Sequence, residues 1–362
     1  MKDLFCGYYR PTEDEFRMLW SKGIFILDTS FILNLYRYSK ETRDDMLKIL
    51  RKLSERLWIP YQVALEYQEN YPRVIEEQKS EYNKVKGILK DPKSNIRNEQ
   101  ILNRLLEDLD YLEQSQPDYN AMRSDIEQIF DKKVGPPPDS QQWLDEVCKE
   151  GEDRYRRELP PGYVDPKKKG EKVCAYGGFS FKEKYGDLIL WKQLIKQATE
   201  REDFKYIVFI TDDSTEDWWW LDKSKTIGPR PELVREIMAE ANVSFFYMYK
   251  SERFMKYAQE YLNIPINQES INQVRDMSKA FEEYQLRVTN MSDQAVDTPW
   301  GNIIAGGTLD VIPPVGFRRP GAYTIIFTPP EPSEDEIEKT KEAFRETRRK
   351  TLTKGEFKKE IE

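Results

Sequence analysis

The segment FKYIVFITDDSTEDWWW (residues 204–220) combines an apolar run, a dense group of acids and three consecutive tryptophans. Residues 205–211 have the length and the β-branched and aromatic content of a buried strand. Directly after this strand come four acids, Asp212, Asp213, Glu216 and Asp217. Neighbouring carboxylates repel one another and are costly to desolvate, so this group needs a stabilising partner at the end of the strand.

The segments on either side alternate between strand and helix patterns. GIFILD (23–28) and RLWIP (56–60) are short apolar runs typical of buried strands, and NVSFFYMY (242–249) predicts the last strand. Helical spacing follows each of the first two, as one helix over 29–53 and another that carries Glu66; further helices are predicted at 186–198 and 231–241. This alternation indicates an α/β domain with a parallel sheet.

Two regions lie outside this alternation. Residues from about 73 to 160 repeat apolar side chains at intervals of three and four, which predicts an inserted helical hairpin or small bundle. We expect it to be a solvated structural arm rather than a catalytic element. The α/β body is expected to occupy residues 1–264. Residues 265–362 are predicted as an accessory region with short strands and a charged tail helix from Ser333, suited to self-association or a protein partner.

Composition excludes several classes of function. Histidine is absent from all 362 residues, which removes Ser-His and Cys-His nucleophiles and His-ligated zinc. The three cysteines are widely spaced and predict neither a disulfide framework nor a zinc site. The sequence has no long apolar run and no apolar leader at its start, so we expect a cytoplasmic protein without a membrane partner. Catalysis would depend on carboxylates, other polar groups or a hard metal ion held by oxygen.

A basic stretch interrupts this acidic protein, whose net charge is −8. Residues 154–184 hold nine cations against four acids, with aromatic residues interleaved. Cations neutralise phosphates and aromatic faces stack on bases, so the mixture suits nucleic acid. A solvated loop is an equally good reading of such a charge run. The residues expected to contact nucleic acid are Lys167, Lys168, Lys169, Lys172, Lys182 and Lys184.

Four acids stand in comparable positions in the predicted elements. Asp28 and Asp213 follow strands, whereas Glu66 and Asp187 lie early in helices. Each alone has an ordinary explanation, such as a helix cap or a favourable place in the helix dipole. In an open parallel sheet, however, ligands bind at the carboxyl ends of the strands. Four acids meeting there need a cation, and carboxylates without His or Cys select Mg²⁺ or Mn²⁺, which commonly serve phosphate esters.

At this point the sequence resembles a known family. The motifs DTSFIL at Asp28, IPYQVALEY at Glu66, KYGDLILW at Asp187 and FITDDSTEDWW together are similar to those of PIN domain nucleases. The nearest resemblance is to the bacterial PIN-like group with a long helical insertion between the second and third acids. It implies a three-layer α/β/α fold around a central parallel sheet, here with a large helical insertion and a small mixed α/β C-terminal region.

The resemblance also implies an activity and a set of site residues. It implies a Mg²⁺- or Mn²⁺-dependent endonuclease that usually cuts RNA, with Asp28, Glu66, Asp187 and Asp213 as the catalytic, metal-binding acids. Asp217 matches an accessory metal-binding acid found in some members. Three residues would support the site: Ser30 beside the first acid, and Thr211 and Asp212 in the Thr-x-Asp pattern before Asp213. Whether Asp212 or Asp217 binds metal stays open at this stage.

The three tryptophans, Trp218 to Trp220, cannot all face one core if they lie on a helix, because successive residues there are about 100° apart. We expect one or two to be buried. The remaining one is predicted to lie against the helical insertion, in preference to lining the cleft.

Three functions compete on this sequence. The leading hypothesis is a metal-dependent ribonuclease, with RNA favoured over DNA and with a role as a toxin or an antiviral defence effector. A phosphatase of the haloacid dehalogenase type ranks low, because Ser30 stands where that chemistry needs a second Asp. A catalytically inactive PIN-like scaffold that binds RNA or protein is the non-enzymatic alternative, and the retention of all four acids weighs against it.

Overall fold

A computed structural model describes residues 1–2, 4–90, 99–114, 117–165, 169–222, 225–241, 243–292, 308–312 and 324–328. The chain divides into two compact units. The first comprises Met1–Ser80 and Gln116–Asp293, and the second comprises Glu81–Ser115 and Gln294–Glu362. The acids predicted from the sequence all lie in the first unit.

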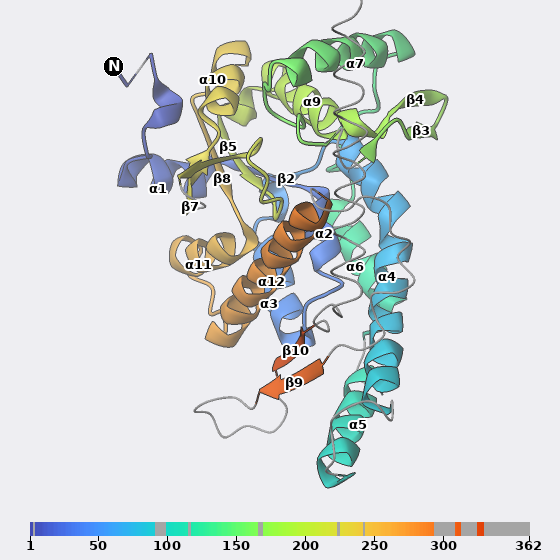
Figure 1. Cartoon of the computed structure of the whole chain (residues 1–362). Helices are drawn as coiled ribbons and strands as arrows, with labels where there is room; N and C mark the ends of the chain where they lie inside the picture. The colour runs from blue at the N-terminus through green and yellow to red at the C-terminus, as the bar shows by residue number, and fades with distance from the viewer. Residues whose placement is uncertain are drawn as a thin grey trace, which may run out of the picture. The chain divides into compact units, whose positions relative to one another are not determined.

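A four-stranded parallel sheet forms the centre of the first unit (Figure 1). Its order is β2 (Leu57–Trp58), β1 (Ile24–Leu27), β5 (Tyr206–Ile210) and β8 (Phe245–Tyr249). The register places Ile26 opposite Phe209, and Phe209 opposite Met248. All four residues of β1 are buried, as expected for a strand covered on both faces. The predicted α/β class with a central parallel sheet is confirmed.

Helices cover both faces of this sheet, because alternate strand residues point to opposite sides. On one face, Trp20 of α1 (Glu13–Lys22) packs against Phe25 and Tyr249, and α11 (Ser251–Tyr261) lies beside α1. On the other face, Trp191 of α9 (Gly186–Glu200) packs against Phe246, and α9 contacts α10 (Pro231–Glu240). The three-layer α/β/α arrangement is therefore confirmed.

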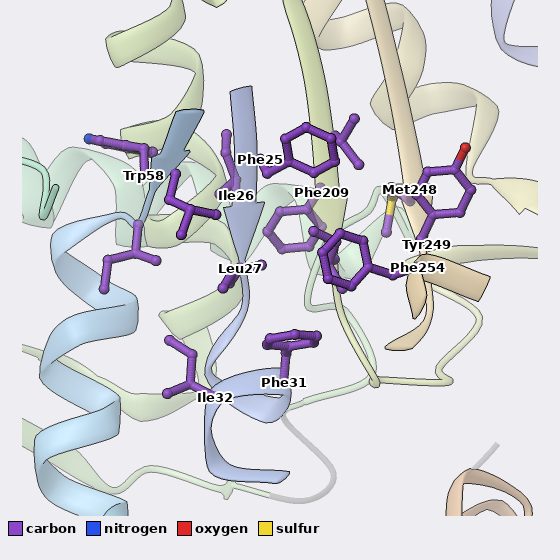
Figure 2. Packing of buried hydrophobic residues seen from close by; sticks show 14 of the residues in the cluster. Phe25, Ile26, Leu27, Phe31, Ile32, Trp58, Phe209, Met248, Tyr249 and Phe254 are labelled. Atoms are coloured by element: carbon purple, nitrogen blue, oxygen red, sulfur yellow. The ribbon is translucent and has the colours of Figure 1, made fainter. Parts of the chain in front are cut away.

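The first turn after β1 is held by aromatic packing. Figure 2 shows Phe31, in α2 (Thr29–Asn34), next to Phe254 of α11, and their ring centroids are 5.8 Å apart. Phe254 also contacts Phe25 of β1 at 6.0 Å. Both phenylalanines of this corner, Phe31 and Phe254, are completely buried. The packing fixes the direction in which the chain leaves β1, and with it the position of Asp28.

The single helix predicted over residues 29–53 is wrong. The segment forms α2 and α3 (Lys40–Lys52), separated by a turn. Ser39 caps α3 by accepting a hydrogen bond from the Thr42 N–H, which favours a new helix start at this point. Tyr36 and Tyr38 are buried in the turn, so the apolar residues that suggested one continuous helical face belong to a packed corner instead.

The described part of residues 73–160 is predominantly helical. α4 (Tyr61–Lys90) runs without interruption from the α/β body into this region, although Pro72 lies inside it, and α6 (Tyr119–Phe130) and α7 (Gln141–Arg156) also belong to the first unit. In the second unit, the end of α4 and α5 (Glu99–Gln114) are joined by an ion pair of 2.6 Å between Lys86 and Asp110. The exact limits of the insertion stay a prediction.

The region after residue 264 begins with α12 (Gln268–Ser292), which contacts α3 and α11 within the first unit. Asp45 of α3 accepts hydrogen bonds from the Ser270 hydroxyl and the Asn267 N–H. In the second unit, β9 (Thr308–Ile312) and β10 (Thr324–Thr328) form an antiparallel pair. The predicted tail helix lies outside the described residues, and the division at residue 264 stays a prediction. Within the described part of the chain, no helix meets the length and hydrophobicity that a membrane span needs.

Candidate active site

Asp28 lies where β1 and β5 end side by side. Its N–H donates to the Ile210 carbonyl at 2.9 Å, which continues the pairing of the two strands by one residue. Its Oδ1 accepts from the Thr29 N–H at 2.7 Å, so Asp28 is also the N-cap of α2. Its Oδ2 accepts from the hydroxyls of Ser30 at 2.6 Å and Thr211 at 2.7 Å. These bonds fix the carboxylate at the carboxyl end of the sheet.

Glu66 reaches the same end of the sheet from α4. Its Oε2 accepts from the Thr29 hydroxyl at 3.0 Å, and its Oε1 accepts from the Gln62 amide at 2.8 Å. Thr29 therefore contacts both acids, one through its backbone and the other through its side chain. A Cβ at Gly186, the first residue of α9, would lie 2.7 Å from Glu66 Oε1. Glycine at this position allows α9 to start against Glu66.

Asp187 follows Gly186 in the first turn of α9, where the helix dipole favours a carboxylate. Its Oδ2 accepts a hydrogen bond of 3.1 Å from the indole N–H of Trp218. That indole is buried: it stacks on Phe209 of β5 at 5.1 Å and meets Trp191 edge-on at 6.3 Å. Trp218 therefore orients Asp187 from the hydrophobic core.

Asp213 lies three residues beyond the end of β5. Its Oδ1 accepts from the Thr215 N–H at 2.8 Å and from the Thr215 hydroxyl at 2.7 Å, which forms a tight local turn. The Asp213 N–H donates to the Thr211 hydroxyl, and its carbonyl accepts from the indole N–H of Trp219 at 2.6 Å. The two buried tryptophans thus hold two different acids.

The acids influence one another because they are partly buried and close to like charges. Burial, together with the charges of Asp187 and Glu66, raises the pKa of Asp28 to about 7, although hydrogen bonds from Ser30 and Thr211 lower it. Burial also raises the pKa of Glu66, and Asp187 adds to that rise. Asp28, Glu66 and Asp187 therefore share one electrostatic site, although they come from three different elements.

Asp217 is buried and has a different role from that of a free surface acid. Its Oδ2 accepts the backbone N–H groups of Gly162 at 2.9 Å and Val164 at 3.3 Å, so it anchors a loop that follows α7. Its Oδ1 is buried without a hydrogen-bond partner among the described residues. Burial and then the charge of Asp187 raise the pKa of Asp217 to about 6. This Oδ1 atom is therefore an oxygen that could accept a hydrogen bond or coordinate a metal ion.

Asp212 points toward a different part of the molecule. Its carboxylate accepts from the Asn34 amide at 2.8 Å, and from the N–H and hydroxyl of Ser251 at 3.0 and 2.7 Å. These contacts join the end of α2 to the start of α11. Only its backbone N–H is directed to the site, where it donates to the Ser30 hydroxyl at 3.0 Å.

Sequence reasoning missed Asp165 at this site, and it assigned Lys169 to nucleic acid rather than to the acids. Asp165 is buried, and its carboxylate pairs with the Lys169 ammonium at 2.7 Å. The same ammonium lies 3.9 Å from Asp187 Oδ1. Burial, followed by the charge of Asp187, raises the pKa of Asp165 to about 8. Their spacing of four residues could have suggested an ion pair, but nothing in the sequence placed that pair beside Asp187.

The other cations expected to contact nucleic acid occupy a hairpin of β3 (Val173–Tyr176) and β4 (Phe179–Lys182) and its flanks. Lys172 pairs with Glu183 at 2.7 Å. Lys182 pairs with Glu171 at 2.7 Å, and Lys184 pairs with the same carboxylate. Lys167 and Lys168 lie outside the described residues. The described lysines of the hairpin are therefore largely neutralised by neighbouring acids.

The three tryptophans do not lie on a helix. Trp218 lies in a turn, and the next residues form β6 (Trp219–Asp222), which pairs with β7 (Lys225–Pro229). Trp218 and Trp219 are buried, as expected. Trp220 is half-buried and meets Tyr8 edge-on at 5.4 Å, so it packs against the N-terminal segment rather than the helical insertion.

The donor set agrees with a hard divalent cation by its chemistry. It consists of carboxylates in a chain without histidine, and it includes the unpartnered oxygen of Asp217. As the side chains stand, no three acids or cysteines of the described ranges are gathered closely enough to ligate one ion. The acids are instead within electrostatic reach of one another, with the Lys169 ammonium between Asp165 and Asp187.

Comparison with known proteins gives one result. A family model described as a PIN-like domain matches residues 24–106 and 95–233, which together span more than half of the chain. The matched range begins at β1 and ends within α10, so it contains Asp28, Glu66, Asp187 and Asp213. No curated protein and no solved structure matches the chain.

Proposed function

The chain belongs to the PIN-like domain family, whose members are generally nucleases, and from that premise we propose that it is a divalent-metal-dependent endonuclease acting on RNA. Asp28, Glu66, Asp187 and Asp213 would hold Mg²⁺ or Mn²⁺, with Asp217 as an accessory ligand. The observation that carries the proposal is that Asp28 and Glu66, both bonded to Thr29, meet at one end of the sheet, where the charge of Asp187 raises the pKa of both. Such a cluster is costly unless a cation compensates it.

The chain's own residues would orient this site before substrate arrives. Ser30 and Thr211 fix Asp28 through their hydroxyls, and Trp218 fixes Asp187 through its indole. When bound, divalent ions would supply Lewis-acid stabilisation of the charge that develops on the phosphate. Mutation of residues that orient metal ligands in this way typically lowers metal affinity or activity by about 10–100-fold.

A cleavage assay with the full chain tests the proposal. Single-stranded RNA, double-stranded RNA and single-stranded DNA of the same base order are incubated with Mg²⁺ or Mn²⁺, and the products are mapped at nucleotide resolution. We expect cleavage of RNA that chelator abolishes and added metal restores. Asp28→Asn and Asp213→Asn should be inactive, whereas the matched control Asp145→Asn, on the exposed face of α7, should cut like the wild type.

Two outcomes would overturn the proposal. Cleavage that resists chelator would exclude the metal, and full activity in Asp28→Asn would exclude the acids. If calorimetry also detected no binding of a divalent ion, the inactive scaffold would become the better account. Trapping of a phosphoryl group on Asp28 would instead support the phosphatase alternative.

The proposal extends to a cytoplasmic toxin or defence effector. Its support is the resemblance to bacterial PIN-like proteins rather than a feature of the site. The test is growth after induced expression in a bacterial host. Growth arrest by the wild type, with no arrest by Asp28→Asn at equal protein level, is the expected result. Equal growth of both strains would remove the toxin reading and would leave the nuclease proposal intact.

A further inference from the structure

The loop after α7 is attached to the acid cluster at two points. Asp217 accepts the backbone N–H groups of Gly162 and Val164. Gly162 has a φ of +88°, and a Cβ there would clash with the Tyr155 hydroxyl and lie 3.2 Å from Asp187 Cβ. The position therefore requires glycine, and the backbone of the loop lies directly against Asp187.

Because the loop is attached in this way, Asp165 and Lys169 lie beside Asp187. The Lys169 ammonium lies 2.7 Å from Asp165 Oδ2 and 3.9 Å from Asp187 Oδ1, and its side chain is 27% exposed. Its charge lowers the pKa of Glu66, which burial otherwise raises. The charges of Asp187, Asp165 and Glu66 together raise the pKa of Lys169, against the opposing effect of burial. The single positive charge of Lys169 thus interacts favourably with the carboxylates of Glu66, Asp165 and Asp187.

We infer that Lys169 is the resident counter-ion of the acid cluster, and that a divalent cation binding at Asp187 competes with its ammonium group. This inference rests on the proposed function, because it requires the acids to bind such a cation. Lys169 would lower the repulsion among Glu66, Asp165 and Asp187 in the metal-free protein, and would weaken metal binding in return. Asp165 would act as the positioning residue that holds the ammonium in place.

Metal binding tests the inference independently of cleavage. Mn²⁺ affinity is measured by calorimetry at neutral pH for the wild type, Lys169→Met, Lys169→Gln and the control Lys172→Met, whose ammonium pairs with Glu183 in the hairpin. Both Lys169 variants should bind Mn²⁺ on the order of tenfold more tightly, because one competing charge is gone. Their melting temperature in chelator should fall, and the rise on adding Mn²⁺ should exceed that of the wild type. Lys172→Met should match the wild type in both measurements.

The outcomes separate this inference from the proposed function. If the wild type binds Mn²⁺ and both Lys169 variants bind it equally or more weakly, the counter-ion role is overturned and the nuclease proposal stands. If neither the wild type nor the variants bind a divalent ion, both proposals are overturned. Circular dichroism of each variant excludes unfolding as the cause, and agreement between the Met and Gln variants excludes an effect of side-chain shape.

A second site is carried by a separate observation, a groove at the edge of the sheet. It encloses about 940 Å³ between the N-terminal segment, the β6–β7 hairpin and the first half of β8, which is an edge strand. Six aromatic residues line it: Tyr8, Tyr9, Trp220, Phe245, Phe246 and Tyr247. Tyr8 and Tyr9 are 57% and 42% exposed, so their rings are accessible.

The charges of this groove are almost all positive. Lys2, Arg10, Lys225 and Arg253 line it, and the single acid among the lining residues, Glu15, is paired with Lys2 at 2.8 Å. Arg10, Lys225 and Arg253 are exposed, and none of the three forms an ion pair within the described ranges. Arg10 and Arg253 both lower the pKa of Tyr247, which burial raises, so both guanidinium groups act on the same ring.

We propose that this groove binds a single-stranded segment of RNA. Unpaired cations neutralise phosphates, and exposed aromatic rings stack on bases, which is the combination that single-stranded nucleic acid requires. The lysines of the β3–β4 hairpin lack this property because acids already pair with them. The groove would hold RNA whether or not the acids cleave it.

Binding without cleavage tests this site. A fluorescent single-stranded RNA of about ten nucleotides, within the range that such sites cover, is titrated in chelator and followed by anisotropy. Arg10→Ala/Arg253→Ala should weaken binding on the order of tenfold, and should flatten the dependence of log Kd on log salt by about 1.4, or 0.7 per lost phosphate contact. Tyr8→Ala should weaken binding without changing that slope.

The control is Lys172→Ala/Lys182→Ala, which removes two paired cations from the hairpin. Wild-type affinity in this control, with weaker binding in the groove variants, is the expected result. The reverse pattern would place RNA on the hairpin and overturn the groove. Because β8 is an edge strand, an extended peptide is the alternative occupant of the groove. Groove substitutions that abolish binding of such a peptide but leave RNA affinity unchanged would also overturn the proposal.

Discussion

The acid cluster and the β3–β4 hairpin are both dense in charge, but they partner their charges differently. In the hairpin, Glu171 is exposed and pairs with both Lys182 and Lys184, which lower its pKa to about 2. In the cluster, Asp28 is half-buried beside other acids, and its pKa is raised to about 7. Charge density in the sequence was similar. The hairpin acid is exposed to solvent and paired with opposite charges, whereas the acids of the cluster are partly removed from solvent and lie near like charges.

The largest expected effect is the loss of Asp28. Asp28→Asn keeps most of the hydrogen-bonding geometry at the end of β1 and removes the charge, so cleavage should fall by a factor on the order of 10³ or more. The metal-free protein should become more stable, because one buried repulsive charge is gone. Cleavage rates and melting temperature in chelator measure the two effects. If Asp28→Asn cleaves RNA more slowly and also melts at a lower temperature in chelator, Asp28 has a structural role and is not one of the repelling acids.

The next effect comes from the indole that orients Asp187. Trp218→Phe keeps an aromatic ring between Phe209 and Trp191 but removes the hydrogen bond of 3.1 Å to the carboxylate. Activity should fall by about 10–100-fold, as is typical when a metal ligand loses its orienting partner. The control is Trp143→Phe, at a half-buried position of α7 outside both the acid cluster and the groove, and it should have wild-type activity. Equal activity of the two variants would contradict an orienting role for Trp218.

The two regions should also respond to pH in opposite directions. The pKa of Asp28 is raised to about 7 and that of Asp165 to about 8, so the folded state binds protons more tightly than the unfolded state above pH 4. The stability of the metal-free protein should therefore fall as pH rises from about 5 to 8, by up to about 1.4 kcal/mol per pH unit for each of the two groups. Saturating Mg²⁺ should remove this slope.

The pKa of the hairpin acid Glu171 is shifted in the opposite direction, so its contribution to stability depends on pH with the opposite sign. The folded pKa of Glu171 is lowered to about 2, so any stabilisation by its lysines is present above its unfolded pKa of about 4.3 and is lost only below that value. Chemical denaturation between pH 3 and 8 measures both ranges. A stability that rises from pH 5 to 8 in chelator would contradict the contrast between the two regions.

The smallest effect is expected from the hairpin itself. Lys182→Ala/Lys184→Ala removes two ion pairs whose shared acid, Glu171, is exposed; such pairs typically contribute about 0–1 kcal/mol, so the melting temperature should hardly change. RNA affinity should change by no more than about twofold, because these cations are already neutralised. Filter binding in chelator provides the measurement. A tenfold loss of affinity would mean that the pairs with Glu171 open on binding, and the contrast between the two regions would fail.

Much of the fold was predictable because it depends on local patterns. Apolar runs such as GIFILD predicted the strands of the sheet, and the family motifs predicted which acids follow them. The turn between α2 and α3 was missed because Tyr36 and Tyr38 continue the apolar spacing of a helix. The strand at Trp219 was missed because its pairing with β7 is not encoded in the three tryptophans themselves.

The candidate site was predictable only in part, for a different reason. Asp28 and Asp213 follow neighbouring strands, so the order of the sheet accounts for both lying at its carboxyl end. Asp165 and Lys169 reach the site through a loop that Asp217 anchors, and such a contact depends on the finished tertiary structure. The pairing of the hairpin lysines also depends on strand register, which places Lys182 and Lys172 next to particular acids. Roles of the individual acids stay predictions until they are mutated.

The side-by-side arrangement of β1 and β5 has a consequence for how the protein is made. The hydrogen bond between Thr211 and Asp28 joins residues that are 183 positions apart, and β5 lies in the middle of the sheet, between β1 and β8. A growing chain that has not yet emerged past Thr211 has neither the central strand nor the hydroxyl that fixes Asp28. The cluster therefore cannot assemble before residues 211–217 have left the ribosome, and shorter nascent chains carry no assembled site beside the ribosome's own RNA.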